Sequence, residues 1–149
     1  MWKVRGSKFI LVMSVFVLFG CFPRGAIHDK YYMLTSLSDI DAISEFKKLP
    51  VNEKVDVYLY GVLYRKPSDY FFSNAFNLSN SVEVSELIIR LNNSQSATET
   101  FALIYALHGV NALTLEKLQL NKFDPVHSCN KFFKDPSPCH QLAYDIKLK

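Results

Sequence analysis

The sequence predicts a mainly α-helical fold. Three observations support this prediction: apolar side chains recur at helical spacing, Ser, Asn and Asp residues stand where these segments begin, and no segment shows a convincing run of alternating strands. The chain has 149 residues, of which 49% are hydrophobic and 21% charged. It is therefore long enough for one domain with a core and too apolar to be disordered.

The first two helices of the domain are expected at Ser38 to Leu49 and at Asn52 to Arg65. Apolar residues recur along one face of each segment, and Pro50 ends the first one. Within the second segment, residues 55–60 are rich in strand formers, and Gly61 weakens a helix by about 1 kcal/mol. We favour a helix over a strand here, because the apolar pattern continues beyond the usual length of a strand.

Three further helices are predicted in the middle of the chain. The first is expected at Asp69 to Asn77 and the second at Ser81 to Leu91. Ser96 and Glu99 have the spacing of a capping box, in which each side chain satisfies a backbone N–H group at the start of a helix. This box opens the clearest helix of the sequence, and Gly109 is expected to close it.

Two shorter helices are expected at about Thr114 to Leu120 and from Ser137 onward. Helices joined by short turns pack as antiparallel neighbours, and residues 51–78 and 82–109 have the layout of two successive helix pairs. This layout resembles HEAT-like helical repeats, in which each pair buries its apolar stripe against the next. An irregular helical bundle is the alternative. The repeat resemblance implies a surface that binds another macromolecule.

The first twenty residues are typical of a secretory signal peptide. Lys3, Arg5 and Lys8 are the only charged residues among them, and an apolar run follows from Phe9 to Gly20. As a helix this run is about 18 Å long, which is too short for a comfortable membrane span. A buried N-terminal helix is the alternative. The predicted organisation is a cleaved signal peptide at 1–20, a tether at 21–35 and a helical domain at 36–149.

The segment Leu18-Phe19-Gly20-Cys21 resembles the lipobox of bacterial lipoproteins. The resemblance implies that Cys21 receives a diacylglycerol group and acyl chains such as palmitate, and that the signal is cleaved just before it. Acyl chains partition into a bilayer at about 0.8 kcal/mol per buried methylene. With Phe22 next, the family's sorting rule implies the outer membrane, facing the periplasm. Simple secretion after cleavage at Ala26, and retention of the segment as an anchor, are the alternatives.

Two cysteines remain, Cys129 and Cys139, which form an even pair in an oxidising compartment. A disulfide between them would close a loop of about 11 residues and contribute roughly 2.5–3 kcal/mol to stability. Zinc is the alternative, because His127 and His140 flank the two cysteines and complete a set of four ligands. A free reactive thiol is a further alternative. We favour the disulfide, since the spacing matches no common zinc module.

The charge balance argues against nucleic-acid binding. The net charge is +3, but outside the first eight residues 14 Lys/Arg face 14 Asp/Glu, so there is no cationic surplus to bind phosphates. The chain has no Gly-x-Ser-x-Gly elbow, His-Glu-x-x-His helix, phosphate loop or Cys-x-x-Cys pair. We therefore predict no enzyme, cofactor or metal. Glu83 and Glu86 are expected on a solvated helix face, and Asp56 at the surface.

Aromatic residues are dense between positions 58 and 76, and on two adjacent helices not all of them can face inward. Tyrosine is enriched in binding hot spots, so we select Tyr60, Tyr64, Tyr70 and Phe72 as candidates for binding a partner. An aromatic core is the alternative. The sequence thus predicts a lipid-anchored, periplasm-facing protein-binding module, either an immunity-type inhibitor of an envelope-targeting toxin or an accessory subunit of an envelope assembly. The alternative function is a carrier of an apolar small molecule or lipid between aromatic helices.

Overall fold

The backbone forms α-helices joined by short turns throughout the part of the chain that the computed structural model describes, residues 24–118 and 123–147. The predicted mainly α fold is confirmed. The signal peptide, the lipobox and Cys21 lie outside the described residues, as do the last two residues of the helix predicted at 114–120. The helices are α1 Arg24–Thr35, α2 Asp39–Lys48, α3 Val51–Tyr64, α4 Ser81–Asn92, α5 Ala97–Leu107, α6 Ala112–Lys117, α7 Pro125–Asn130 and α8 Pro138–Lys147, with a 3₁₀ helix η1 at Phe71–Ala75.

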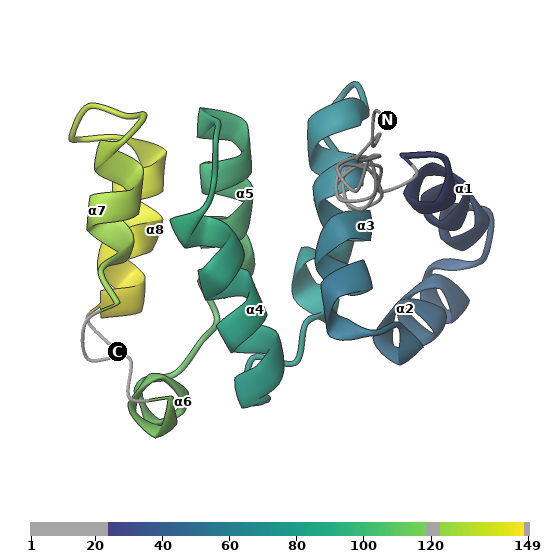
Figure 1. Ribbon diagram of the computed structural model, residues 1–149, viewed down its shortest axis with the longest axis horizontal. Coiled ribbons are helices and arrows are strands. Elements are labelled where there is room, and N and C mark those ends of the chain that lie inside the picture. Colours follow the sequence, from purple (N-terminus) through teal and green to yellow (C-terminus); the bar gives the residue numbers. More distant parts are fainter. Residues whose placement is uncertain (1–23, 119–122, 148–149) are drawn as a thin grey trace, which may run out of the picture.

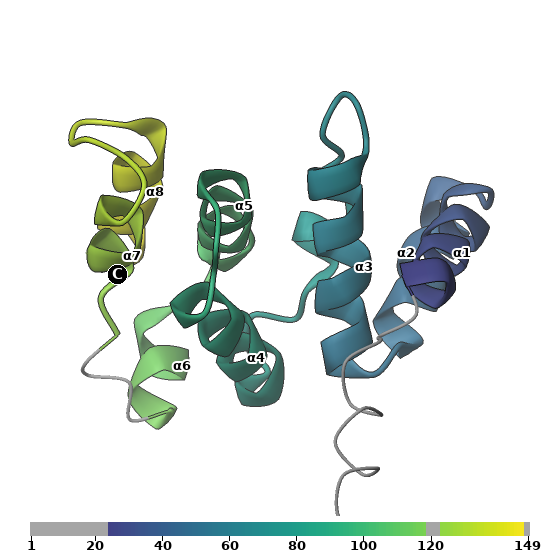
Figure 2. The ribbon, with the colours of Figure 1, turned by 45° about the horizontal axis from the view of Figure 1, so that its top comes forward.

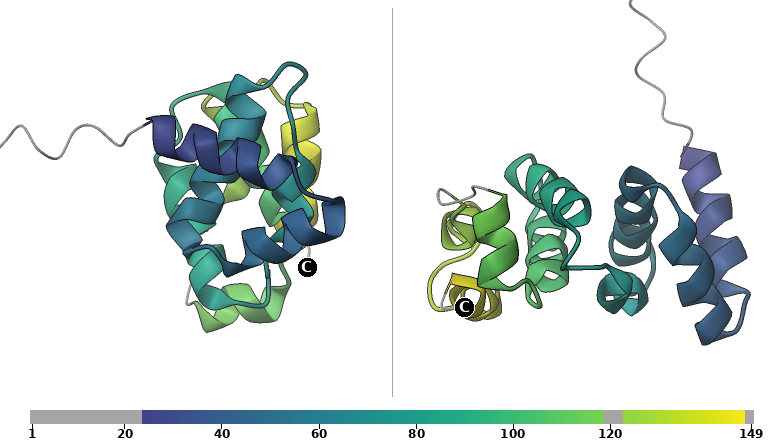
Figure 3. Two further views of the ribbon diagram at one scale, coloured as in Figure 1. Left: turned by 90° about the vertical axis from the view of Figure 1, so that its right-hand side faces the viewer. Right: turned by 90° about the horizontal axis from the view of Figure 1, so that it is seen from below.

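The helices cross the molecule in chain order (Figure 1). They run from α1 and α2 at one end, past α3, to α4 and α5, and finally to α7 and α8 at the other end. The same succession is visible in the tilted view and from below (Figures 2 and 3). α5 packs against both α3 and α8, while α4 and α7 pack beside α5. Each helical layer thus buries its apolar stripe against its neighbours along the chain.

α3 is a helix, as predicted, and its environment explains its strand-like composition. It packs against α1, α4, α5 and η1, so it is covered on several sides. Consecutive residues from Val57 to Leu59 are buried, and so are Val55 and Val62. A helix surrounded in this way needs apolar residues around most of its circumference rather than along one stripe. The helix begins at Val51, one residue before the predicted start at Asn52, and its N-cap is Pro50.

Side-chain caps fix where several helices begin. The Ser38 hydroxyl accepts a hydrogen bond from the backbone N–H of Asp41 at the start of α2. The capping box at α5 is also confirmed: the Ser96 hydroxyl accepts from the N–H of Glu99 at 3.2 Å. The Glu99 carboxylate, however, accepts from the N–H of Gln95 at 3.0 Å, one residue before the expected donor. Both bonds satisfy N–H groups that have no partner within the helix.

Residues 24–35 form a helix, which corrects the prediction of a tether over residues 21–35. α1 packs against both α2 and α3, and it buries Tyr31 and Leu34 completely in the domain core. Ile27 lies four residues before Tyr31 and also contacts the core, so the buried stripe has helical spacing. Pro23 and Gly25 suggested an irregular segment, but the domain begins by residue 24.

Two other elements differ from the prediction. The helix expected at 69–77 is only the short 3₁₀ helix η1, and the preceding Asp69 carboxylate accepts from the N–H of Phe71 at 2.8 Å. α7 was not predicted, although Asp124 caps it and Pro125 occupies its first turn. Gly109 does not have the left-handed backbone expected at a helix end. A Cβ at this position would lie 2.9 Å from Leu78 Cδ1, so the end of the Leu78 side chain would have to shift to accommodate it.

The predicted disulfide between Cys129 and Cys139 is present. It joins α7 to α8, its Cα atoms are 5.9 Å apart, and both residues are fully buried in the core. The last helix, α8, is therefore fixed to α7 by a covalent bond, and both helices pack against α5. Among the described residues, no helix combines the length and the apolar character needed to cross a membrane.

Candidate binding surface

The structure divides the four predicted binding residues among three environments. Tyr60 and Tyr64 lie on α3 beside aromatic residues of α1. Tyr70 lies against α5, in a separate aromatic group. Phe72 belongs to the core. Tyr60 and Tyr64 therefore form the centre of the best candidate surface.

We define the α1–α3 aromatic surface by five residues: His28, Tyr32, Tyr60, Tyr64 and Arg65. The ring centroids of Tyr60 and Tyr64 are 5.3 Å apart. The His28 ring bridges the two helices, since it lies 4.6 Å from Tyr32 and 5.8 Å from Tyr60. Tyr64 is 56% exposed and Tyr32 40% exposed, so the cluster presents aromatic area to solvent. Such ring pairs, at centroid distances of about 4.5–7 Å, stabilise one another.

Tyr31 lies beneath this surface and holds it in place. Its ring contacts Tyr60 and Tyr32, at centroid distances of 5.2 and 5.5 Å, and its hydroxyl donates a hydrogen bond to the Asp69 carboxylate. Burial, followed by the hydrogen bond and the charge of Asp69, raises the pKa of Tyr31 well above its usual range. Tyr31 therefore stays neutral and keeps donating to Asp69 across the physiological pH range.

Arg65 supplies a cation at the edge of the surface. Its Nη1 donates to the Tyr32 hydroxyl at 2.6 Å, and its guanidinium carbon lies 5.2 Å from the centre of the Tyr32 ring. The nearby Tyr32 raises the pKa of Arg65, so the side chain remains charged. These contacts fix the arginine on the aromatic ring while leaving it exposed. Further along the same helices, Lys30 forms an ion pair with Glu53, which also joins α1 to α3.

Tyr70 belongs to a second and smaller aromatic group on α5. Its ring centroid lies 5.4 Å from Tyr105 and 6.3 Å from Phe101. Burial, followed by the neighbouring Tyr105, raises the pKa of Tyr70. The structure places this group on η1 and α5 and not with α1, so Tyr70 does not join Tyr60 and Tyr64 in one surface.

Phe72 is a core residue, which corrects its selection as a partner-binding residue. It is 2% exposed, and its ring stacks on Phe46 at a centroid distance of 4.5 Å. Phe76 packs edge-on against Phe46 and Tyr58, at 5.5 and 5.6 Å. For these residues the alternative of an aromatic core is correct, because the rings fill the space between their helices themselves.

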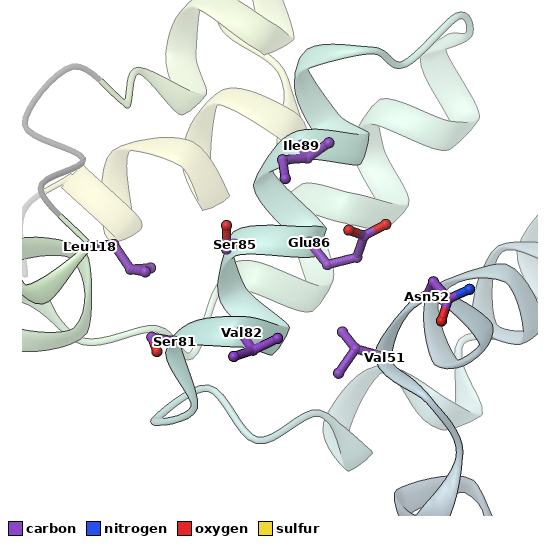
Figure 4. A pocket seen from close by; sticks show the side chains of 8 residues that line it. All are labelled: Val51, Asn52, Ser81, Val82, Ser85, Glu86, Ile89 and Leu118. Carbon is purple, nitrogen blue, oxygen red and sulfur yellow. The ribbon is translucent and has the colours of Figure 1, made fainter.

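A groove of about 540 Å³ lies along the outer face of α4, between the start of α3 and the end of α6 (Figure 4). The Val82 and Val51 side chains project into the space between α4 and α3 (Figure 4). Ile89 stands two turns beyond Val82 on α4, and both residues are exposed. The groove is wide open and combines these apolar groups with polar ones, including Ser85 and Glu86.

Three members of the α1–α3 aromatic surface were not predicted, namely His28, Tyr32 and Arg65. The signal that could have identified the first two is their spacing of four residues, which places both on one face of a helix. This signal was missed because residues 21–35 were interpreted as a tether.

The three acidic residues predicted on a solvated face or at the surface, Glu83, Glu86 and Asp56, are engaged in ion pairs. Glu83 is buried and pairs with Lys54 at 2.7 Å, so its prediction on a solvated face is wrong. Glu86 and Asp56 both contact Arg90, at 2.9 and 2.8 Å. The Lys54–Glu83 and Asp56–Arg90 pairs join α3 to α4, whereas the Glu86–Arg90 pair lies within α4.

The zinc alternative is contradicted, because the two cysteine sulfurs that it requires are bonded to each other. His140 is buried, and its ring nitrogens contact Ser137 Oγ at 2.7 Å and Asn130 Oδ1 at 2.8 Å. Within residues 24–118 and 123–147, no group of three or more His, Cys, Asp or Glu side chains is placed to hold a metal ion.

No protein-family model matches the sequence, and comparisons with curated proteins and with solved structures give no significant match.

Proposed function

We propose that this chain is a lipid-anchored helical module that binds a protein partner in the bacterial envelope through the α1–α3 aromatic surface. The observation that carries the proposal is the exposure of clustered Tyr side chains with an arginine among them. Tyr and Arg are among the residue types enriched in hot spots. Tyr buries a large area with little loss of side-chain entropy, and Arg adds a cation with several N–H donors.

The contacts within the surface support this role. Arg65 is held against Tyr32 by a hydrogen bond and by the ring, and Tyr60 is supported from below by Tyr31. Side chains that are already fixed lose less entropy on binding, which favours affinity. Arg65 and the neighbouring exposed Lys66 give this end of the surface a positive charge. A partner with acidic or carbonyl groups around an apolar patch would be complementary to it.

The start of α1 is close in sequence to the proposed anchor. α1 begins at Arg24, three residues after Cys21, and three residues span at most about 11 Å. His28 follows within the second turn of the helix. If Cys21 carries acyl chains, the surface therefore lies near the lipid headgroups. This location suits an inhibitor that meets a toxin at the membrane, and equally a subunit of an envelope assembly.

The carrier alternative receives less support. It requires space between the aromatic helices, and the rings of Phe46, Phe72 and Phe76 occupy that space by contacting one another.

The test of the binding surface starts with a photoreactive amino acid at position 64, introduced in cells and crosslinked to identify the partner by mass spectrometry. Binding of the purified partner is then measured for wild type and for the Tyr64→Ala and Tyr60→Ala variants. We expect Kd to rise at least about 30-fold for each, which corresponds to a hot-spot loss of about 2 kcal/mol. Tyr105→Ala, on the second aromatic group, is the matched control. Unchanged affinity in both variants, with native helical content, would contradict the proposed surface.

The lipid anchor is tested separately by changing Cys21 to Ser. Mass spectrometry of the purified protein should show acyl chains on the wild type and none on the variant, and the variant should leave the outer-membrane fraction. Acylation or the same membrane fractionation in the variant would refute the anchor without affecting the binding surface.

A further inference from the structure

A polar pocket, separate from both the α1–α3 aromatic surface and the groove along α4, lies between the end of α2, η1 and the start of α4. Its volume is about 390 Å³. Polar groups that line it are Lys47 on α2, Lys54 on α3, Asn74 on η1 and Glu83 on α4, together with Asn77. Four elements thus contribute polar side chains to one opening.

Lys54 is the unusual member of this pocket, because its side chain is almost fully buried although it ends in a cation. The residue is 5% exposed, and its Nζ donates to Glu83 Oε1 at 2.7 Å. An ammonium group has three N–H donors. Within the described part of the chain, Glu83 is the one side chain or carbonyl that this ammonium contacts as an acceptor. Two of its donors therefore remain for a group inside the pocket.

Both oxygens of the Glu83 carboxylate accept hydrogen bonds from the protein. Its Oε1 accepts from Lys54, and its Oε2 accepts from the backbone N–H of Asn77 at 2.8 Å. Glu83 is itself only 4% exposed. The carboxylate is thus the counter-ion of the buried Lys54 side chain.

Lys47 and Asn74 also line the pocket and carry N–H donors, whereas the Asn77 side-chain oxygen accepts from the backbone N–H of Ser79 at 3.2 Å. Lys47 is exposed in the last turn of α2, and Asn74 is exposed on η1. Over residues 24–118 and 123–147, neither side chain makes a hydrogen bond to the protein. Two lysines therefore face one carboxylate, which leaves a formal charge of +1 in the pocket.

We propose that this pocket binds a small monocarboxylate, with its oxygens between the ammonium groups of Lys54 and Lys47 and the amide of Asn74. A single negative charge neutralises the surplus, and the flat carboxylate accepts several N–H donors at once. A dianionic phosphate would be repelled by Glu83, since only one positive charge is uncompensated. Phe76 lines the same pocket and supplies an apolar wall for the group attached to the carboxylate. The proposal does not depend on the lipid anchor or on the α1–α3 aromatic surface.

The experiment is a titration of the ¹⁵N-labelled protein with sodium acetate, followed through backbone amide shifts at constant ionic strength. We expect saturable shifts centred on Asn74 and Asn77, which chloride at the same concentrations does not produce. Lys47→Gln should weaken acetate binding at least fivefold. Lys48→Gln is the matched control: it removes the same charge from the next residue of α2, whose side chain pairs with Glu45 outside this pocket. The Kd of the Lys48→Gln variant for acetate should be within twofold of the wild-type value.

Two comparisons define the ligand. Phosphate that binds as tightly as acetate would overturn the assignment to a monocarboxylate, and so would shifts that do not saturate or are equal in the two lysine variants. A short N-acetylated peptide with a free C-terminal carboxylate is then compared with its amidated form. Tighter binding of the free peptide than of acetate would identify a chain terminus as the source of the carboxylate, whereas binding of acetate alone would identify a small free acid.

Discussion

Gly61 on α3 and Tyr31 on α1 pack so closely that the glycine has no room for a side chain. A Cβ at position 61 would lie 2.8 Å from Tyr31 Cε2 and 3.1 Å from the carbonyl oxygen of Asp69. The same three residues are linked by hydrogen bonds, because Tyr31 donates to the Asp69 carboxylate and the Asp69 N–H donates to the Gly61 carbonyl at 3.1 Å. A glycine that is unfavourable for the isolated helix is therefore required for the contact between α1 and α3.

Gly61→Ala should lower the free energy of unfolding by up to about 2 kcal/mol, because forcing an extra methyl group into a packed contact usually costs about 1–3 kcal/mol. Alanine offsets about 1 kcal/mol of this cost, because it favours a helix more than glycine does. Tyr31 cannot move away freely, because it is buried and bonded to Asp69. Urea denaturation followed by circular dichroism measures the difference.

Gly25→Ala is the control for this substitution. A Cβ at Gly25, in the first turn of α1, meets no atom within 4 Å. The change should leave stability unaltered or raise it by a few tenths of a kcal/mol. If Gly61→Ala were as stable as Gly25→Ala, the contact between α1 and α3 would have to be loose enough to shift, and α1 would not be fixed on the domain.

The contact between Gly61 and Tyr31 also shows what the sequence could not predict. α3 was predictable because its apolar pattern is longer than a strand. α1 was not, because its burial depends on a glycine 30 positions away that lets the two helices approach. Its local signals, Pro23 and Gly25 at the start, favour an irregular segment. α1 is therefore helical because of its packing against α3, although its local sequence favours an irregular segment.

Only part of the candidate surface could be predicted from the sequence. Tyrosine density identified Tyr60 and Tyr64, but their neighbours on α1 could not be found while α1 was unknown. Periodicity also could not show which of Tyr64 and Phe72 is exposed. Tyr64 lies at the surface, whereas Phe72 is buried and stacks on Phe46 of α2. Glu83 is buried because Lys54, 29 positions earlier, neutralises it. Partners at such separations leave no pattern in a single sequence.

The disulfide between Cys129 and Cys139 should contribute about 2.5–3 kcal/mol to stability, because it closes a loop of about 11 residues in the unfolded chain. We expect the double change to Ser to lower the midpoint of urea unfolding accordingly, with little change in the slope. Native helical content should persist at low denaturant, since α8 also packs against α5.

Reductant provides the internal control for the disulfide. It should destabilise the wild type to about the level of the double variant and have no effect on the variant itself. Thiol counting under denaturing conditions without reductant should find neither Cys129 nor Cys139 reactive. Two reactive thiols at these positions would contradict the disulfide.

Alkaline pH should destabilise the protein through its buried tyrosines. Burial, followed by the neighbouring Tyr70 and Tyr105, raises the pKa of Tyr58 far above the ordinary value near 10. Above about pH 10, Tyr58 therefore loses its proton in the unfolded chain but keeps it in the folded one. The unfolded state then binds fewer protons, so the free energy of unfolding falls with rising pH, by up to about 1.4 kcal/mol per pH unit for this residue.

Tyr58→Phe tests this linkage. At pH 7 the variant should be about 1 kcal/mol less stable than wild type, because the hydroxyl donates to the Ala102 carbonyl at 2.8 Å. The difference in the free energy of unfolding should shrink to near zero by about pH 11. Only the wild type has an ionisable group at position 58, so only the wild type loses stability there as the pH rises. Denaturant curves at pH 7, 9, 10 and 11, with recovery on return to pH 7, measure it. Parallel stability curves for the two proteins would refute the role of Tyr58.

Removing one partner of the buried ion pair between Lys54 and Glu83 should lower the free energy of unfolding strongly, whereas replacing both partners should lower it little. Lys54→Met leaves the Glu83 carboxylate buried with only the N–H of Asn77 as a partner, so we expect a loss of about 3 kcal/mol in the free energy of unfolding. Adding Glu83→Gln removes the uncompensated charge, and the Gln oxygen can still accept from Asn77. The double variant should therefore recover most of the loss, as urea denaturation of the two variants and wild type would show. Equal stability of the single and double variants would mean that the Glu83 charge is solvated in the folded protein, which would also remove the basis for a buried, ligand-binding ammonium at Lys54.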